Sequence, residues 1–223
     1  SQTIGARFTP TLGPVKIAAA AYYQTGNVKH VDTKLSAMYF ALEGSMKTSE
    51  NTGLTLGFEY LSGTSLKDKI EDETSMKSFT PLYGTNHKFN GHMDYFYVGN
   101  HGDNVGLIDI YATFNVKAKK WGFFLTPHYF MAAAEVYKVK PAKADFDESA
   151  YENMSKGLGF EVDFGVTYAA QENMMFKMGV SGMFGTETMG VVKGYNSTDD
   201  YKKNGSWVYV MAVFKPNFYT KEK

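Results

Sequence analysis

Apolar and polar residues alternate along most of this chain. The clearest example is the segment 160–168, in which the even positions carry Phe, Val or Tyr and the odd positions include Glu161 and Asp163. A period of two is typical of a β-strand with one apolar and one polar face. Water or a charged partner has to reach the polar face of this segment, because burying a carboxylate without either is costly. The segments 54–60 and 108–116 alternate in the same way.

The alternation predicts about nine extended segments, each long enough to cross a bilayer as a tilted strand of about 9–11 residues. They are residues 4–12, 15–24, 34–46, 54–62, 107–116, 122–136, 158–168, 174–187 and 206–218. The connections between them differ in length. Short connections lie at 47–53, 117–121 and 169–173, and long polar connections lie at 63–106, 137–157 and 189–205.

Short and long connections alternate, which is typical of a barrel with short periplasmic turns and longer outer loops. We therefore predict an all-β fold, a transmembrane antiparallel up-and-down β-barrel surrounded by the lipid of a Gram-negative outer membrane. No repeat, low-complexity tract or linker divides the sequence, so residues 1–223 are expected to form one structural unit.

The same alternation predicts the direction of the strands. A periplasmic turn at Gly13 and Pro14 makes the first strand run towards the periplasm, so that Ser1 lies on the outer side and residues 221–223 lie in the periplasm. Bacterial single-chain barrels have an even number of strands. An odd number of strands, with the two termini on opposite sides, predicts that the sequence is the C-terminal part of a longer chain.

The composition excludes several classes of protein. Lys and Arg number 23 and Asp and Glu also number 23, so the net charge is zero and a basic nucleic-acid binder is excluded. The longest apolar run, residues 17–23, is far shorter than the roughly 20 residues of a membrane-spanning helix. Aromatic residues make up 16% of the chain, which favours β-structure, and the absence of cysteine excludes disulfides and thiolate metal sites.

One stretch resembles a known family. Residues 79–99 read Phe-Thr-Pro-Leu-Tyr-Gly-Thr-Asn-His-Lys-Phe-Asn-Gly-His-Met-Asp-Tyr-Phe-Tyr-Val-Gly, after a Leu-Ser-Gly-Thr-Ser turn at 61–65 and before Gly-Leu-Ile-Asp-Ile-Tyr at 106–111. This succession resembles the alginate export family of outer-membrane porins, with the specific similarity confined to residues 54–116. The resemblance implies a barrel of about 18 strands, of which the present segments are half. It also implies passive diffusion through a lumen constricted by inward-folded loops and charged side chains.

The family name does not define the solute. A carboxylated polysaccharide calls for arginines, because guanidinium groups bind carboxylates in a bidentate manner. Arg7 is the only arginine in the chain.

Eleven residues are candidates for the lining of the pore. Inward carboxylates would set an internal field, with Arg7 and Lys177 as candidate partners, and the stretch 87–95 can hydrogen-bond to and stack on sugars. The candidates are Arg7, Glu59, His87, Lys88, Asp94, Tyr95, Asp109, Tyr111, Glu161, Asp163 and Lys177. Two structural interpretations stay open. The carboxylates can form a paired network that braces the wall, and Gly84, Asn86, Gly91 and Asp94 can serve only the backbone of a folded loop.

No metal, cofactor or catalytic site is predicted. His87 and His92 lack a third ligand at fixed spacing, and the acidic residues Asp145, Asp147, Glu148 and Glu152 lack the spacing of an EF-hand loop. The sequence has no phosphate-binding loop and no Gly-x-Ser-x-Gly elbow, and no serine lies two residues from His128.

Aromatic residues near the predicted strand ends are expected to form a girdle at the membrane interfaces. They are Trp121, Tyr137, Trp207, Tyr209, Phe218 and Tyr219.

The predicted function is selective passive diffusion of small or oligomeric hydrophilic solutes, saccharides included, without enzymatic activity. Two alternatives remain open. One is a barrel without a transport role, which serves as a subunit or anchor and binds other envelope proteins. The other is a small complete barrel that acts on lipids as an enzyme, with an interior packed by side chains.

Overall fold

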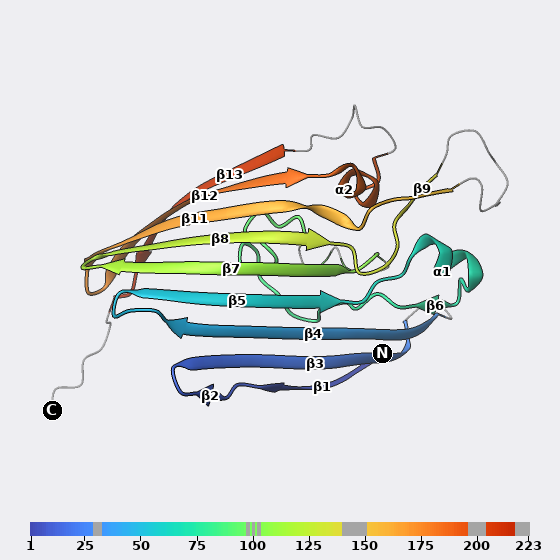
Figure 1. The fold of residues 1–223 in the computed structure, drawn as a ribbon, viewed down its shortest axis with the longest axis horizontal. Coiled ribbons are helices and arrows are strands. Elements are labelled where there is room, and N and C mark those ends of the chain that lie inside the picture. Colours follow the sequence, from blue (N-terminus) through green and yellow to red (C-terminus); the bar gives the residue numbers. More distant parts are fainter. Residues whose placement is uncertain are drawn as a thin grey trace.

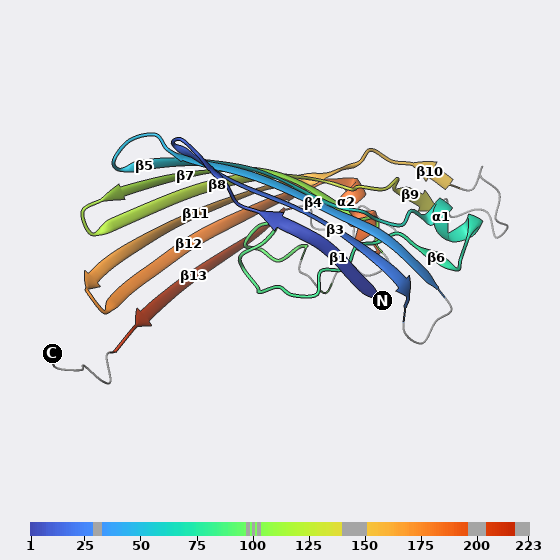
Figure 2. The ribbon, with the colours of Figure 1, turned by 90° about the horizontal axis from the view of Figure 1, so that it is seen from below.

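The chain forms one large, curved antiparallel sheet (Figures 1 and 2). The computed structural model describes residues 1–28, 33–96, 99, 101, 104–139, 151–195 and 204–216. The main path of the sheet contains β1 (Gln2–Phe8), β3 (Val15–Asn27), β4 (Lys34–Lys47), β5 (Thr52–Leu61), β7 (Leu107–Ala118), β8 (Trp121–Met131), β11 (Gly157–Gln171), β12 (Met174–Gly185) and β13 (Asn204–Phe214). Each of these strands pairs with its neighbours along the chain, so the connectivity is up-and-down.

All nine predicted segments are strands, and the prediction of an all-β antiparallel fold is confirmed. The sheet is not closed into a barrel. β1 and β13 are its two edges, and no pairing joins them among the described residues.

Four predicted strands end earlier than expected. The segment 174–187 ends as a strand at Gly185 and the segment 206–218 at Phe214; the other two are 4–12 and 122–136. The segment 4–12 is interrupted at Pro10, which has no N–H to donate to a ladder, and continues as the short β2 (Thr11–Leu12). β2 turns at Gly13, whose φ is +59°, and pairs with the beginning of β3. The segment 122–136 ends as a strand at Met131, and the chain then bends away from the sheet.

The connections are segregated by length between the two ends of the sheet (Figure 1). The long ones contain α1 (Leu66–Glu71), β6 (Ser75–Met76), the hairpin of β9 (Tyr137–Val139) and β10 (Tyr151–Asn153), and α2 (Glu187–Val192). The end of β3 and the start of β4 also lie at this end, and only six residues separate Asn27 from Lys34, so the alternation of short and long connections is not strict. Within the described residues, neither helix is long and apolar enough to cross a membrane.

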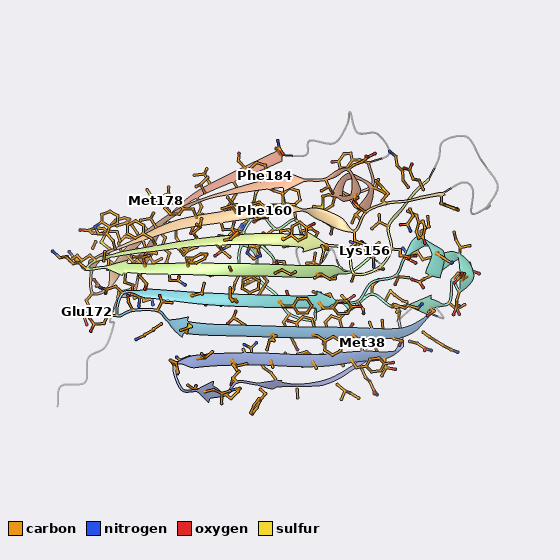
Figure 3. All side chains as sticks on the ribbon, in the orientation of Figure 1. Met38, Lys156, Phe160, Glu172, Met178 and Phe184 are labelled. Atoms are coloured by element: carbon orange, nitrogen blue, oxygen red, sulfur yellow. The ribbon has the colours of Figure 1, made fainter. Side chains whose placement is uncertain are left out.

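The convex face of the sheet is apolar and exposed. Met38, Phe160, Met178 and Phe184 project from it, as Figure 3 shows. They belong to a set of exposed, largely apolar side chains that extends over all nine main strands: Ile4, Phe8, Tyr23, Met38, Phe40, Leu42, Leu56, Phe58, Ile110, Phe114, Phe123, Leu125, Phe160, Phe164, Phe176, Met178, Val180, Phe184, Val208 and Val210. A surface of this extent is rare on a soluble protein unless something covers it.

The concave face is covered at one end. Leu61, Leu107, Phe130, Leu158 and Met183 face inwards where their strands meet the long connections, and they form a buried core with residues from those connections. Phe79, Phe96 and Met189 are the main contributors from the connections. The core therefore lies between the sheet and its own loops.

Candidate functional site

The connection between β5 and β7 folds back onto the concave face, where Figure 2 shows it beneath the arc of strands. Its first anchor is Gln24 on β3, which is buried. The Gln24 amide accepts a hydrogen bond from Thr80 N at 2.9 Å and donates one to Thr80 O at 2.7 Å. These two bonds fix the backbone at the point where the segment 79–96 starts across the sheet.

A second anchor is the Leu-Ser-Gly-Thr-Ser turn. Ser62 Oγ donates to Lys77 O at 2.6 Å, and the hydroxyls of Thr64 and Ser78 are 2.7 Å apart. Gly63 is required here, because a Cβ at this position would overlap the backbone of Val105. The turn therefore holds both ends of the connection together.

Four carboxylates meet on the concave face under this segment. Glu59 on β5 is the cross-strand partner of Asp109 on β7, and Glu161 and Asp163 lie two residues apart on the inward face of β11. Asp109, Glu161 and Asp163 are almost completely buried. Burial of this kind requires compensating donors, because an uncompensated buried charge is expensive.

Asn90 and His128 supply some of these donors. Asn90 Nδ2 donates to both Glu59 and Asp109, at 3.2 Å in the second case. His128 on β8 has its Nδ1 2.9 Å from Asp109 Oδ1 and its Nε2 3.7 Å from Asp163 Oδ2. One amide and one imidazole thus connect three of the four carboxylates across β5, β7, β8 and β11.

The backbone of the segment binds the other pair. His92 N donates to Asp163 Oδ2 at 3.2 Å, and Met93 N donates to Glu161 Oε1 at 2.9 Å. Asn90 and Gly91 have φ values of +55° and +85°. Successive left-handed residues of this kind can turn backbone N–H groups towards an anion. A Cβ at Gly91 would lie 2.6 Å from the Glu161 carboxyl carbon, so only glycine fits beneath the backbone.

The tip of the segment also rests on β13. The His87 ring stacks on Trp207 with centroids 4.2 Å apart, and the His92 ring meets Trp207 edge-on at 6.5 Å. His87 N donates to Asp94 Oδ1 at 2.7 Å, which closes the tip on itself. Tyr95 lies against β13 at Gly205, where a Cβ would come within 2.6 Å of its hydroxyl.

Burial affects the titratable groups at the end of the segment. Burial lowers the pKa of His101 below its ordinary value, and its Nε2 lies 2.9 Å from Phe96 O. Burial also lowers the pKa of Lys193, whose ammonium lies 5.3 Å from the centre of the Phe96 ring. Both groups are outside the main strands.

Two adjoining cavities, of about 610 Å³ and about 460 Å³, lie between the segment and the strands β1, β3, β4, β5, β7, β8 and β11. They share Arg7, Glu59 and Asn90 in their linings. Seven of the predicted residues line one or both cavities: Arg7, Glu59, Lys88, Asp94, Asp109, Tyr111 and Asp163. Four do not: His87, Tyr95, Glu161 and Lys177.

Arg7 and Lys177 do not pair with the carboxylates. Among the described residues, no ion pair joins either side chain to Glu59, Asp109, Glu161 or Asp163. Lys177 lies between Thr167 and Met211, near the short-turn end of the sheet. Instead of Arg7 and Lys177, the carboxylates contact the Asn90 amide, the His128 imidazole and backbone N–H groups.

Some expectations about individual residues need correction. Trp207 and Tyr209 face the concave side and stack on each other at 4.9 Å, so they are not part of an outer girdle. Trp121 is exposed and packs on Tyr168 at 4.6 Å, and the Tyr137 hydroxyl donates to Glu135. Phe218, Tyr219, Asp145, Asp147 and Glu148 lie outside the described residues, whereas Glu152 is exposed on β10.

Sequence reasoning missed several functional contacts. The alternation did not single out Tyr39, whose hydroxyl donates a hydrogen bond to Glu59. It also did not single out Glu43, which accepts a hydrogen bond from Tyr111 Oη at 2.7 Å. The sequence alone suggests His128 only as a possible base for a serine. Their positions in the alternating pattern could have identified them. Residues 39, 43 and 128 lie on the same inward face as the carboxylates of the neighbouring strands.

Among the described residues, the arrangement offers neither an activated nucleophile nor a metal site made of three His, Asp or Glu side chains. Both nitrogens of His128 face carboxylates, and no described hydroxyl group is hydrogen-bonded to it. Within the described ranges, no three His, Asp or Glu side chains stand together so that they could hold a metal ion. Comparison with known protein families and with curated proteins gave no match.

Proposed function

We propose that this chain forms part of the wall of an outer-membrane porin, which allows hydrophilic solutes to diffuse passively across the membrane. The observation that carries the proposal is the difference between the two faces of the sheet. Exposed Leu, Ile, Val, Phe, Met and Tyr side chains cover the convex face along all nine main strands, and carboxylates with their partners occupy the concave face. Lipid against the convex face and water against the concave face is the environment that suits this difference.

The inward-folded segment supports a transport role. It narrows the space next to the concave face without filling it, because the two cavities remain between residues 82–94 and the strands. Their linings are mixed, with Arg7 and Lys88 near Glu59, Asp109 and Asp163. A wall with both signs of charge suits polar, hydrogen-bonding solutes such as small saccharides. The resemblance of residues 54–116 to the alginate export family supports the porin class and leaves the solute open.

The test uses the full-length protein extracted from its native outer membrane. Its intact mass and its mobility on a gel with and without heating establish whether the strands belong to a larger closed barrel. Reconstitution into planar bilayers then measures conductance, and liposome swelling measures the flux of neutral sugars. Discrete conductance steps with sugar-dependent swelling are the expected result.

The same measurements distinguish the main rival. A folded, heat-modifiable protein that gives no conductance and co-purifies with stoichiometric envelope proteins would replace the porin with an anchoring subunit. The segment 79–96 gives this alternative a structural basis, because it covers the carboxylates and reaches β13 at Trp207. A protein whose inward segment blocks the lumen would give this result.

A further inference from the structure

Few of the described groups that can carry a positive charge face the carboxylates under the inward segment. Among the residues that the structure describes, the His128 imidazole lies within ion-pair distance of Asp109 and Asp163. The half-buried His92 imidazole also interacts electrostatically with Asp163. Glu59 and Asp109 are bonded to Asn90, Tyr39 and His128. Glu161 and Asp163 receive mainly backbone N–H groups, which are neutral.

Three oxygen atoms at the Glu161 and Asp163 end are buried without a hydrogen-bond partner among the described residues. They are Glu161 Oε2, Asp163 Oδ1 and Ser181 Oγ. The exposed fraction is 0% for Glu161 and 1% for both Asp163 and Ser181. Native proteins satisfy nearly all buried polar atoms, so three such oxygens in one place indicate a missing partner.

These oxygens belong to neighbouring positions. Ser181 on β12 is the cross-strand partner of Asp163 on β11, and directly opposite residues have Cβ atoms about 4.5–5.5 Å apart. Glu161 is two residues from Asp163 and therefore on the same face. The backbone at Gly91 closes over Glu161 from the other side.

We propose that Glu161, Asp163 and Ser181 bind a divalent cation of the Ca²⁺ type between β11, β12 and the inward segment. Hard cations prefer carboxylate and hydroxyl oxygens, and a charge of two balances the two carboxylates. Ca²⁺ takes about 6–8 oxygen ligands, so water completes its shell. The other oxygens of the two carboxylates hold the N–H groups of His92 and Met93, and the cation thereby fixes the inward segment to the wall.

The position of Trp207 provides a direct test. Trp207 is the cross-strand partner of Ser181 on the same face, so it can sensitise the luminescence of Tb³⁺ bound in place of Ca²⁺. Full-length protein in detergent is depleted with a chelator and titrated with Tb³⁺. Saturable luminescence that Ca²⁺ displaces is expected in the native protein and in Trp121→Phe, and it should be lost in Trp207→Phe.

Variants of the ligands complete the experiment. Glu161→Gln and Asp163→Asn should abolish saturable Tb³⁺ binding, and Glu43→Gln, which removes a charge elsewhere on the concave face, should leave it unchanged. Ser181→Ala keeps every hydrogen bond of the inward segment and should weaken binding by at least about tenfold. This variant remains informative if the acidic ones do not fold, which the heat-modifiability gel reports.

Several outcomes would overturn the proposal. One is the absence of displaceable Tb³⁺ luminescence in the native protein. Another is equal Tb³⁺ binding by the native protein, Glu43→Gln and Ser181→Ala. A third is a midpoint of thermal unfolding that responds to pH or Na⁺ but not to Ca²⁺. The pH response would indicate that the two carboxyl groups share a proton instead. Binding is measured without reference to conductance, so failure of the porin function and failure of the cation site remain distinguishable.

Discussion

At the scale of single residues, the inward segment depends on a glycine that touches a carboxylate. Gly91 has a φ of +85°, and a Cβ there would lie 2.6 Å from the Glu161 carboxyl carbon. Backbone strain and steric overlap therefore act together at this residue. Gly194 has the same φ, but no atom lies within 4 Å of the place that its Cβ would occupy.

The two glycines make a matched pair of substitutions. Gly194→Ala should cost about 1–3 kcal/mol from strain alone. Gly91→Ala should cost more and should release the segment, because the N–H bonds from His92 and Met93 cannot form with the backbone displaced. Hydrogen–deuterium exchange of peptides covering residues 85–96 measures the release. Equal exchange in the two variants would contradict the close contact between Gly91 and Glu161.

Asn90 acts by supplying a neutral donor to two acids. Asn90→Asp would place a third carboxylate between Glu59 and Asp109, and breaking a buried charged network in this way typically costs about 3–5 kcal/mol. Faster proteolysis of the segment at neutral pH is the expected result. Asn86→Asp is the control, because Asn86 is exposed in the same segment and undergoes the same change of charge. Similar proteolysis of both variants would show that Asn90 does not bridge the acids.

At the scale of elements, the strands could be predicted from the alternation of residues, whereas the individual contacts of the long connection could not. The period of two fixed which side chains of β5, β7 and β11 share a face, because alternation is a local property of a strand. The contact between His92 and Asp163 joins residues 71 positions apart. No local pattern encodes a contact at that separation. The inward face of Trp207 is different, because β13 alternates Trp207 and Tyr209 with the exposed Val208 and Val210, and this local pattern predicts it.

The long connection should respond to acid through its buried histidines. Burial lowers the pKa of both His92 and His101, so the released segment, with pKa values of about 6.5, binds protons more readily than the packed one. The packing stability is complete above pH about 6.5 and falls as the pH drops towards the lower pKa values of the packed state.

Exchange measurements at pH 7.5 and pH 5.5, corrected for the intrinsic rate, test this response. Residues 92–96 should lose protection at the lower pH. The loss should be smaller in His101→Gln, which retains a side-chain donor for Phe96 O. Lys193, which lies beside Phe96, is unchanged in this variant, so its charge contributes equally to both proteins. A pH response that is unchanged in His101→Gln would exclude His101 as a contributor.

At the scale of the whole molecule, the exposed apolar face needs an apolar environment, and this requirement can be measured. Phe164 lies in the middle of β11 on the convex face, between Leu125 and Val180 on the neighbouring strands. If lipid covers this face, Phe164→Lys should lower the free energy of unfolding in vesicles by about 2–4 kcal/mol, the cost of a lysine at the bilayer midplane. Thr55→Lys on the concave side of β5 should cost much less, because water reaches that side and neighbouring residues are polar. Denaturant unfolding of both full-length variants in the same vesicles provides the comparison. If the two lysines cost the same, the convex face does not face lipid and the assignment of a membrane to this sheet is wrong.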